Sequence, residues 1–235
     1  MANQPIIPDG RLAAAAGFVR EGAVFADIGT DHAYLPIALV GNGTVGRAFA
    51  LDVKKGPLSR AEKNVRAAGL SDRVGTVLSD GLTKLPEPCD CLVFAGMGGR
   101  LIAELLSSRE GAAPSSLAAA SQLVLQPQSE PETVRRALRE LGFRTESERM
   151  VRDRGKYYLV ISAVPGESKA REEELLFGTL MGGQDPVFRE YLLEEREKNA
   201  RILKKLEKNA GASSGARVRE LEEYLSRIEK ELAKW

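Results

Sequence analysis

The stretch VFADIGTDHAYLPIALV, residues 24–40, combines the pattern of a buried strand with a polar cluster that no strand needs. The apolar run over residues 22–28 predicts the strand, which stops at Asp27 and Gly29. The cluster follows at once and consists of Asp31, His32 and Tyr34. In a doubly wound sheet, ligands bind at the carboxyl ends of the strands. We therefore interpret this stretch as a strand followed by part of a binding site.

Further strand patterns alternate with helical ones over the first two thirds of the chain. The other expected parallel strands cover residues 47–53, 73–80, 91–96 and 122–126. One helix pattern begins at Pro57 and ends before Gly69, as a helix with an N-terminal proline and a C-terminal glycine would. Residues 129–132 resemble a capping box ahead of another helix. Strands separated by helices predict a parallel sheet covered on both faces.

The pattern changes after residue 142. The strand-like runs FRTESERMV and KYYLVISAV are joined by the short polar segment RDRG, which predicts a hairpin. The fold class is therefore α/β, a Rossmann-like, seven-stranded, doubly wound sheet whose last strand is antiparallel. We expect this domain to cover residues 1–165.

Residues 166–235 are rich in Glu, Lys and Leu and predict a C-terminal helical coiled-coil domain. The apolar positions of the last helix step by three and four, which is a coiled-coil seam. They are Val218, Leu221, Leu225, Ile228, Leu232 and Trp235. The small-residue turn over residues 209–216 would fold this helix back antiparallel on the one before it. Such a hairpin either stabilises the chain or contacts a macromolecular substrate.

Composition excludes some classes of protein. The chain has 235 residues, of which 43% are hydrophobic, and no run of about 18 apolar residues predicts a membrane span. The N-terminus lacks a signal-peptide pattern. Cys89 and Cys91 are too close for an ordinary disulfide and too few for a zinc site, so we expect no metal and a cytoplasmic protein. The net charge of +1 favours no partner, but the basic segment 144–156 is either a solvated hairpin or a phosphate-binding edge.

Four strand ends carry residue types suited to an adenosine-bearing cofactor. Asp27 and Gly29 follow the first strand, and Asp52, about 20 residues further on, can accept hydrogen bonds from ribose hydroxyls. Residues 80–82 (Asp80, Gly81 and Leu82) follow the third strand and suit an adenine edge. Gly96 lies in AGMGG after the fourth, where small residues let the backbone approach a ligand. Each signal is weak alone, but the ordered set is not.

The first turn indicates which cofactor this is. A dinucleotide-binding turn reads G-x-G-x-x-G and seats a pyrophosphate on a helix N-terminus. Here the turn is G-T-D-H-A-Y, with one glycine and with a carboxylate, Asp31, that would repel phosphate. A cofactor with a cationic centre and no phosphate fits better, and S-adenosylmethionine is such a cofactor.

The chain resembles class I S-adenosylmethionine-dependent methyltransferases and, more narrowly, the bacterial family that methylates N1 of adenine 22 in tRNA. The segments that carry the resemblance are DIGTDHAYLP (27–36), KKGPLSRAEKNV (54–65), SDGL (79–82), AGMGG (95–99) and LQPQ (125–128). It runs over essentially the whole chain. Asp31 and Ala33 depart from the general class pattern E/D-x-G-x-G-x-G, which has the smallest residue, glycine, at their positions.

The resemblance implies a role for each strand end. Asp27 and Gly29 would hold the methionine part of S-adenosylmethionine, and Gly96 would border the methyl group. Asp52 would hold the ribose, and Val53 would also belong to the cofactor site. Asp80, Gly81 and Leu82 would meet the adenine. The implied substrate is tRNA, with phosphate contacts from the 144–156 hairpin and the helical arm, and no obligate protein partner is evident.

The departure at the first turn suggests the catalytic residues. N1 of neutral adenine has a lone pair, so methyl transfer needs alignment and charge accommodation rather than proton removal. We assign Asp31 to the developing positive charge, Tyr34 to stacking on or hydrogen-bonding the base, and His32 to orienting Asp31 or contacting N7. The alternatives are a helix cap for Asp31 or His32 and plain packing for Tyr34. Two other functions stay open: a methyltransferase of this fold with another substrate, and a non-catalytic nucleotide-binding protein.

Overall fold

The structure is a computed structural model that describes residue 7 and residues 9–107, 113–183, 185–208 and 215–235. The chain divides into two compact units, Met1–Thr179 and Leu180–Trp235, which are described separately. The domain boundary expected after residue 165 stays a prediction. Within the described residues, no helix combines the length and the apolar character that a membrane span requires.

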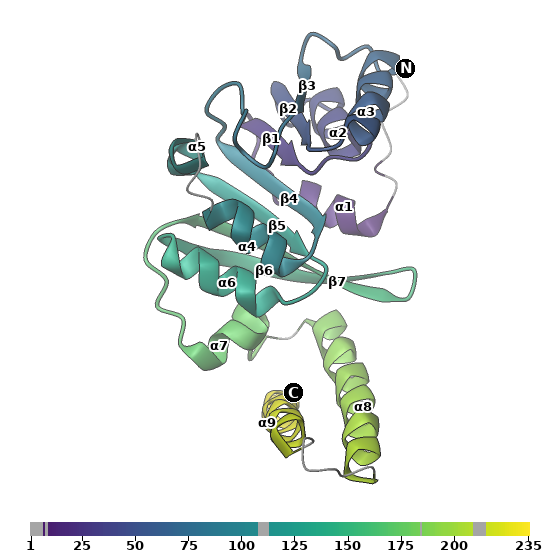
Figure 1. Ribbon diagram of the computed structural model, residues 1–235, viewed down its shortest axis with the longest axis vertical. Helices are drawn as coiled ribbons and strands as arrows, with labels where there is room; N and C mark the ends of the chain where they lie inside the picture. Colours follow the sequence, from purple (N-terminus) through teal and green to yellow (C-terminus); the bar gives the residue numbers. More distant parts are fainter. Residues whose placement is uncertain (1–6, 8, 108–112, 184, 209–214) are drawn as a thin grey trace. The chain divides into compact units, whose positions relative to one another are not determined.

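A seven-stranded sheet forms the centre of the first unit, in the order β3-β2-β1-β4-β5-β7-β6 (Figure 1). The strands are β1 (Val24–Ile28), β2 (Arg47–Asp52), β3 (Val74–Leu78), β4 (Cys91–Met97), β5 (Gln122–Pro127), β6 (Phe143–Asp153) and β7 (Lys156–Pro165). Strands β1 to β5 pair in parallel, and β7 is antiparallel to both of its neighbours. The predicted seven-stranded sheet with an antiparallel last strand is confirmed.

Two groups of helices cover the sheet. The helices of this unit are α1 (Gly10–Ala16), α2 (Tyr34–Gly41), α3 (Lys55–Ala67), α4 (Gly99–Ser107), α5 (Ala113–Ala119), α6 (Pro131–Glu140) and α7 (Glu172–Phe177). In one group, α2 contacts both α1 and α3. In the other, α4 contacts α5 and α6, and α6 also contacts α7. The central strands between these layers are buried along almost their whole length, as parallel strands covered on both faces must be.

The strand register aligns β1 with its neighbours β2 and β4 near the end of β1. Ile28 pairs with Leu51 of β2 and with Phe94 of β4, so the residues that follow these three strands lie side by side. The strand order reverses between β1 and β4, which is the position where such sheets bind ligands. The sequence-predicted residues after β1, β2 and β4 therefore flank the switch point.

Strands β6 and β7 form a hairpin that extends past the rest of the sheet (Figure 1). Only residues 161–163 of β7 pair with β5, whereas the β6–β7 ladder continues to Asp153 and Lys156. Arg154 and Gly155 connect the strands with φ of 48° and 75°, as a two-residue turn with left-handed backbone requires. The predicted hairpin is confirmed.

The capping box predicted over residues 129–132 is wrong. Helix α6 begins after Glu130, whose φ of 52° is left-handed and whose side chain makes no capping hydrogen bond. The Ser129 carbonyl accepts the Gly99 N–H, so this loop is tied to the neighbouring loop instead of capping its own helix. Pro131 then starts the helix with its fixed φ.

The second unit is a pair of packed helices, α8 (Pro186–Lys208) and α9 (Gly215–Leu232). The short helix η1 (Gly178–Leu180) spans the boundary between the two units along the chain. The seam residues Leu221 and Ile228 of α9 are buried, while Trp235 at the end of the seam is exposed. Glu195 of α8 accepts a hydrogen bond from the Tyr224 hydroxyl of α9 at 3.3 Å. The helical C-terminal region is confirmed, and most of the predicted turn, residues 209–214, lies outside the described residues.

Candidate active site

Asp27, near the end of β1, is a buried carboxylate beside the switch point. It is 7% exposed, and loss of water contact raises its pKa from 3.8 to about 6. A hydrogen bond with Thr30 and the charge of Arg11 lower the pKa, while the charge of Asp52 raises it. A carboxylate held this way favours a cationic ligand group, whose charge would offset the cost of burying the ionised form.

The turn after β1 is held in a strained conformation. Ala33 is fully buried with a left-handed φ of 55°, which costs a residue with a side chain roughly 1–2 kcal/mol. The Ala33 N–H donates to Thr30 Oγ1 at 3.1 Å, and Asn64 Nδ2 of α3 donates to the His32 carbonyl at 2.9 Å. These two bonds fix the direction in which the turn presents its side chains.

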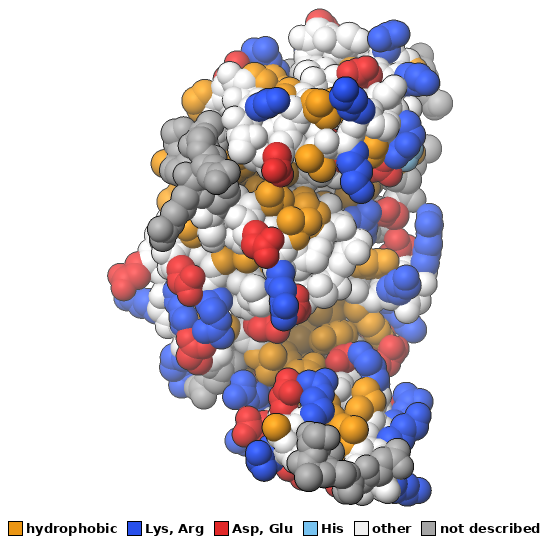
Figure 2. Space-filling view, viewed as in Figure 1, with side chains coloured by type: hydrophobic (Ala, Val, Ile, Leu, Met, Phe, Trp, Pro, Cys, Tyr) orange, Lys and Arg blue, Asp and Glu red, His pale blue; other side chains and the backbone are white. Residues whose placement is uncertain are grey.

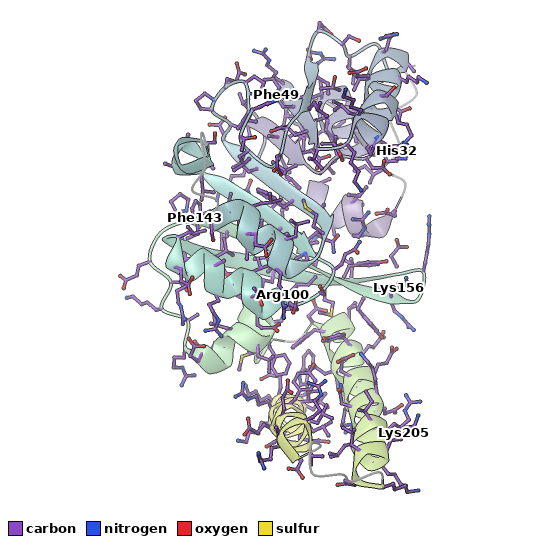
Figure 3. All side chains as sticks on the ribbon, in the orientation of Figure 1. His32, Phe49, Arg100, Phe143, Lys156 and Lys205 are labelled. Atoms are coloured by element: carbon purple, nitrogen blue, oxygen red, sulfur yellow. The ribbon has the colours of Figure 1, made fainter. Side chains whose placement is uncertain are left out.

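Asp31, His32 and Tyr34 form one contiguous cluster (Figure 3 labels His32). Asp31 Oδ2 lies 3.2 Å from His32 Nε2, and the His32 and Tyr34 rings stack with centroids 5.1 Å apart. Asp31 Oδ1 also accepts from Arg60 Nη2 of α3 at 2.6 Å. The Asp31 side chain is 59% exposed, so this pair contributes little stability and leaves Asp31 accessible.

The helix-cap alternatives for the cluster are wrong. The N-cap of α2 is Ala33, and no side chain caps this helix. Tyr34 is 40% exposed, which does not fit a plain packing role. The orienting contact proposed between His32 and Asp31 is present, and the catalytic roles of the three residues stay predictions.

The predicted residues at the ends of β2 and β3 differ in how exposed they are. Asp52 Oδ1 accepts the Lys54 N–H at 2.7 Å, and its Oδ2 has no hydrogen bond within the described residues. Val53 is 60% exposed. After β3, Asp80 is exposed, whereas Gly81 and Leu82 are buried. Any part that Leu82 plays in ligand binding would therefore come through the shape of the turn.

Gly96 at the end of β4 touches two polar side chains that sequence reasoning missed. Its N–H donates to Gln126 Oε1 at 3.0 Å, and Arg11 Nη1 of α1 donates to the same oxygen at 2.9 Å. Gly96 has a φ of 80°, and a Cβ there would lie 3.1 Å from Arg11 Nη1. A glycine is therefore required. Gln126 lies in the quoted segment LQPQ, but no sequence signal marked Arg11.

Gly99 of AGMGG packs against the neighbouring loop. A Cβ on Gly99 would overlap the carbonyl oxygens of Ser129 and Glu130, so Gly99 lets the loops after β4 and β5 lie against each other. The expectation that the small residues of this segment let the backbone approach a ligand stays a prediction, and the contact that the structure gives Gly99 is with the next loop. Arg100, labelled in Figure 3, pairs with Glu130 across these loops at 2.9 Å.

The structure gathers most predicted site residues at one edge of the sheet. Asp27, Gly29, Asp52 and Gly96 flank the switch point, with the cluster of the first turn beside them. Asp80 follows β3, which is the next strand out from β2. Within the described residues, no group of three or more His, Cys, Asp or Glu side chains is placed to hold a metal ion. The arrangement is suited to binding a cationic organic ligand and to aligning it.

Comparison with known proteins identifies close relatives. Residues 25–231 match a family model described as tRNA (adenine(22)-N(1))-methyltransferase. The curated tRNA (adenine(22)-N(1))-methyltransferase of Bacillus subtilis is 34% identical over 198 residues, which cover 83% of this chain and 78% of the relative.

Solved structures agree with this match. A Streptococcus pneumoniae protein in complex with S-adenosyl-L-methionine is 33% identical with a TM-score of 0.84, covering 94% of this chain and 98% of that one. M. capricolum TrmK in complex with the cofactor product S-adenosyl-homocysteine is 26% identical with a TM-score of 0.82, covering 96% and 97%.

Proposed function

The chain belongs to the tRNA (adenine(22)-N(1))-methyltransferase family, and we propose from this premise that it methylates N1 of adenine 22 in tRNA with S-adenosylmethionine as methyl donor. The observation that carries the proposal is the family match over residues 25–231, across the whole set of strand ends described above. A function in the cytoplasm is part of this proposal, since the substrate is tRNA.

The residues at the strand ends fit the cofactor. The buried carboxylate of Asp27 suits the ammonium of the methionine part, because that group would hold it ionised at a position where burial disfavours its charge. Asp52 has an oxygen left for ribose hydroxyls, and the exposed apolar side chain of Val53 beside it suits one face of the adenine. The cofactor supplies a methyl group on a positively charged sulfur.

The chain's own contribution to the reaction is alignment and electrostatics. Adenine N1 attacks with its own lone pair, so no residue has to remove a proton first. Positive charge develops on the base, and Asp31 is the exposed carboxylate of the first turn. Tyr34, stacked on His32 and exposed, offers a ring against which the base can lie. The target base has to leave its stack to reach these groups.

Basic side chains on the β6–β7 hairpin and on α8 would contact tRNA phosphates. Lys156 is exposed at the end of the hairpin (Figure 3). Part of the positive charge is neutralised internally, since Arg20 pairs with Glu146 at 3.0 Å and Lys198 with Glu195 at 2.8 Å. Figure 2 accordingly shows Lys and Arg interspersed with Asp and Glu on the visible face. The basic groups considered on α8 are Arg189, Arg196, Lys198, Arg201, Lys204, Lys205 and Lys208.

Incubating the protein with labelled S-adenosylmethionine and an unmodified tRNA that carries adenine 22 is expected to give 1-methyladenosine at that position. The same tRNA with guanine at position 22 is the matched control and should remain unlabelled there. Nuclease digestion with mass spectrometry locates the modified nucleoside. Absence of 1-methyladenosine at position 22 would contradict the proposal, and label elsewhere would favour a methyltransferase of this fold with another substrate.

Replacing Asp52 with alanine is expected to weaken S-adenosylmethionine binding by about 10- to 100-fold, because hydrogen bonds from the ribose to a charged acceptor are lost. Calorimetric titration without tRNA measures this effect directly. Asp72→Ala is the control, since Asp72 is an exposed aspartate of the same unit that lies outside the proposed site. Unchanged affinity in Asp52→Ala would remove Asp52 from the cofactor site.

A further inference from the structure

The segment LQPQ contains two glutamines that the structure uses differently. Gln126 is fully buried, and both ends of its amide are engaged: Oε1 accepts from Gly96 and Arg11, and Nε2 donates to the Pro127 carbonyl at 3.2 Å. Gln128 is exposed, and its amide makes no hydrogen bond with any residue that the structure describes. One amide is thus structural, and the other is available to a ligand.

Gln128 is held close to the place where methyl transfer is proposed. Its Nε2 lies 3.8 Å from the position that a Cβ on Gly96 would take. Gly96 is the residue assigned to the border of the methyl group, so the inference rests on the proposed function. If Gly96 borders the methyl group, the acceptor base has to lie near this glycine for its N1 to reach the methyl group.

The backbone around Gln128 is hydrogen-bonded to the neighbouring loop. Its N–H donates to the Met97 carbonyl at 2.8 Å, and the Gly99 N–H donates to the Ser129 carbonyl at 2.9 Å. The ion pair between Arg100 and Glu130 closes the same pair of loops. Because these backbone bonds are already made, binding through Gln128 would not have to order the backbone, which favours a recognition role.

The chemistry of the reaction restricts what Gln128 can contact. N1 of adenine must stay free, which leaves the N6 amino donor and the N7 acceptor as the groups that identify the base. A glutamine amide, with one acceptor and one donor side by side, matches these two groups. Guanine presents two acceptors, O6 and N7, and mismatches the amide oxygen. We propose that Gln128 reads the N6–N7 edge of the target adenine and thereby selects adenine over guanine.

The test uses tRNA assembled with either adenosine or 7-deazaadenosine at position 22. The deaza base replaces N7 by C–H and keeps N1 and N6. The wild-type protein is expected to lose about 10-fold in kcat/KM on the deaza substrate, since one of two hydrogen bonds is missing. Gln128→Leu is expected to lose about 10- to 100-fold on ordinary tRNA and to treat both substrates alike.

Gln128→Glu is the matched variant, because it keeps the shape and the acceptor for N6 but no longer donates to N7. It should show no penalty on the deaza substrate, because its carboxylate no longer donates to N7 and faces the N7 lone pair instead. Affinity for S-adenosylmethionine should stay within about 2-fold in both variants, which separates base reading from a damaged cofactor site. Full activity of Gln128→Leu, or a deaza penalty that persists in it, would overturn the inference. Failure of the wild-type protein to methylate ordinary tRNA would instead overturn the proposed function.

Discussion

Replacing Asp31 with alanine is expected to slow methyl transfer by about 100-fold while S-adenosylmethionine affinity stays within a few-fold. Asp31 is an exposed carboxylate on a turn whose backbone is fixed by Thr30 and Asn64, so its position relative to an entering base is set before the base arrives. Positive charge appears on the adenine only as the methyl group moves. A carboxylate that acts on this charge affects the rate more than it affects binding of either substrate.

Single-turnover rates with saturating cofactor and tRNA measure this effect, and calorimetric titration measures cofactor affinity. Arg60→Ala separates two explanations, because it removes the ion-pair partner of Asp31 but keeps the carboxylate. If the pair served only to hold the turn, both variants would lose the same rate. The catalytic role of Asp31 is contradicted if Asp31→Ala weakens cofactor binding as strongly as Asp52→Ala is expected to.

The sheet could be predicted from sequence because its determinants are local and periodic. The buried strand over residues 22–28 and the RDRG turn each carry their own signal within a few residues. The order of residues at the strand ends follows from the parallel sheet itself. Once the strands are placed, Gly29, Asp52 and Gly96 must meet at one edge.

The contacts that shape the site could not be predicted, because they join segments far apart in the chain. Arg60 forms an ion pair with Asp31, and Asn64 holds the first turn by a hydrogen bond. Both residues lie on α3, the second helix after that turn. Arg11 reaches Gln126 across the unit. The capping-box prediction failed for the same reason. The Ser129 carbonyl accepts a hydrogen bond from the loop after β4, and no local sequence pattern indicates that neighbour.

Asp27→Asn is expected to stabilise the protein and to impair cofactor binding at the same time. Burial raises the folded-state pKa of Asp27 from 3.8 to about 6, so the folded protein binds more protons than the unfolded chain between these pH values. Its ionisation therefore costs stability progressively as the pH rises from about 4 to about 6, and the full cost persists above that. Two pKa units correspond to about 3 kcal/mol, which asparagine would not incur.

The expected result at pH 7.5 is a free energy of unfolding higher than that of the wild-type protein by about 1–3 kcal/mol and a melting temperature raised by roughly 3–10 °C. The difference should vanish below about pH 3, where the wild-type carboxyl is protonated in both the folded and the unfolded state. S-adenosylmethionine affinity should fall about 100-fold or more, because the ammonium loses a charged partner. Asp72→Asn, at an exposed position, should change neither quantity.

A less stable Asp27→Asn at pH 7.5 would show that the carboxylate is held by favourable contacts, whereas this structure gives it one hydrogen bond with Thr30 and the charge of Arg11 against its burial. A buried carboxylate that destabilises the empty protein and is needed by the full one is the expected signature of a cofactor-binding residue, since binding the cation then removes the cost that folding incurred.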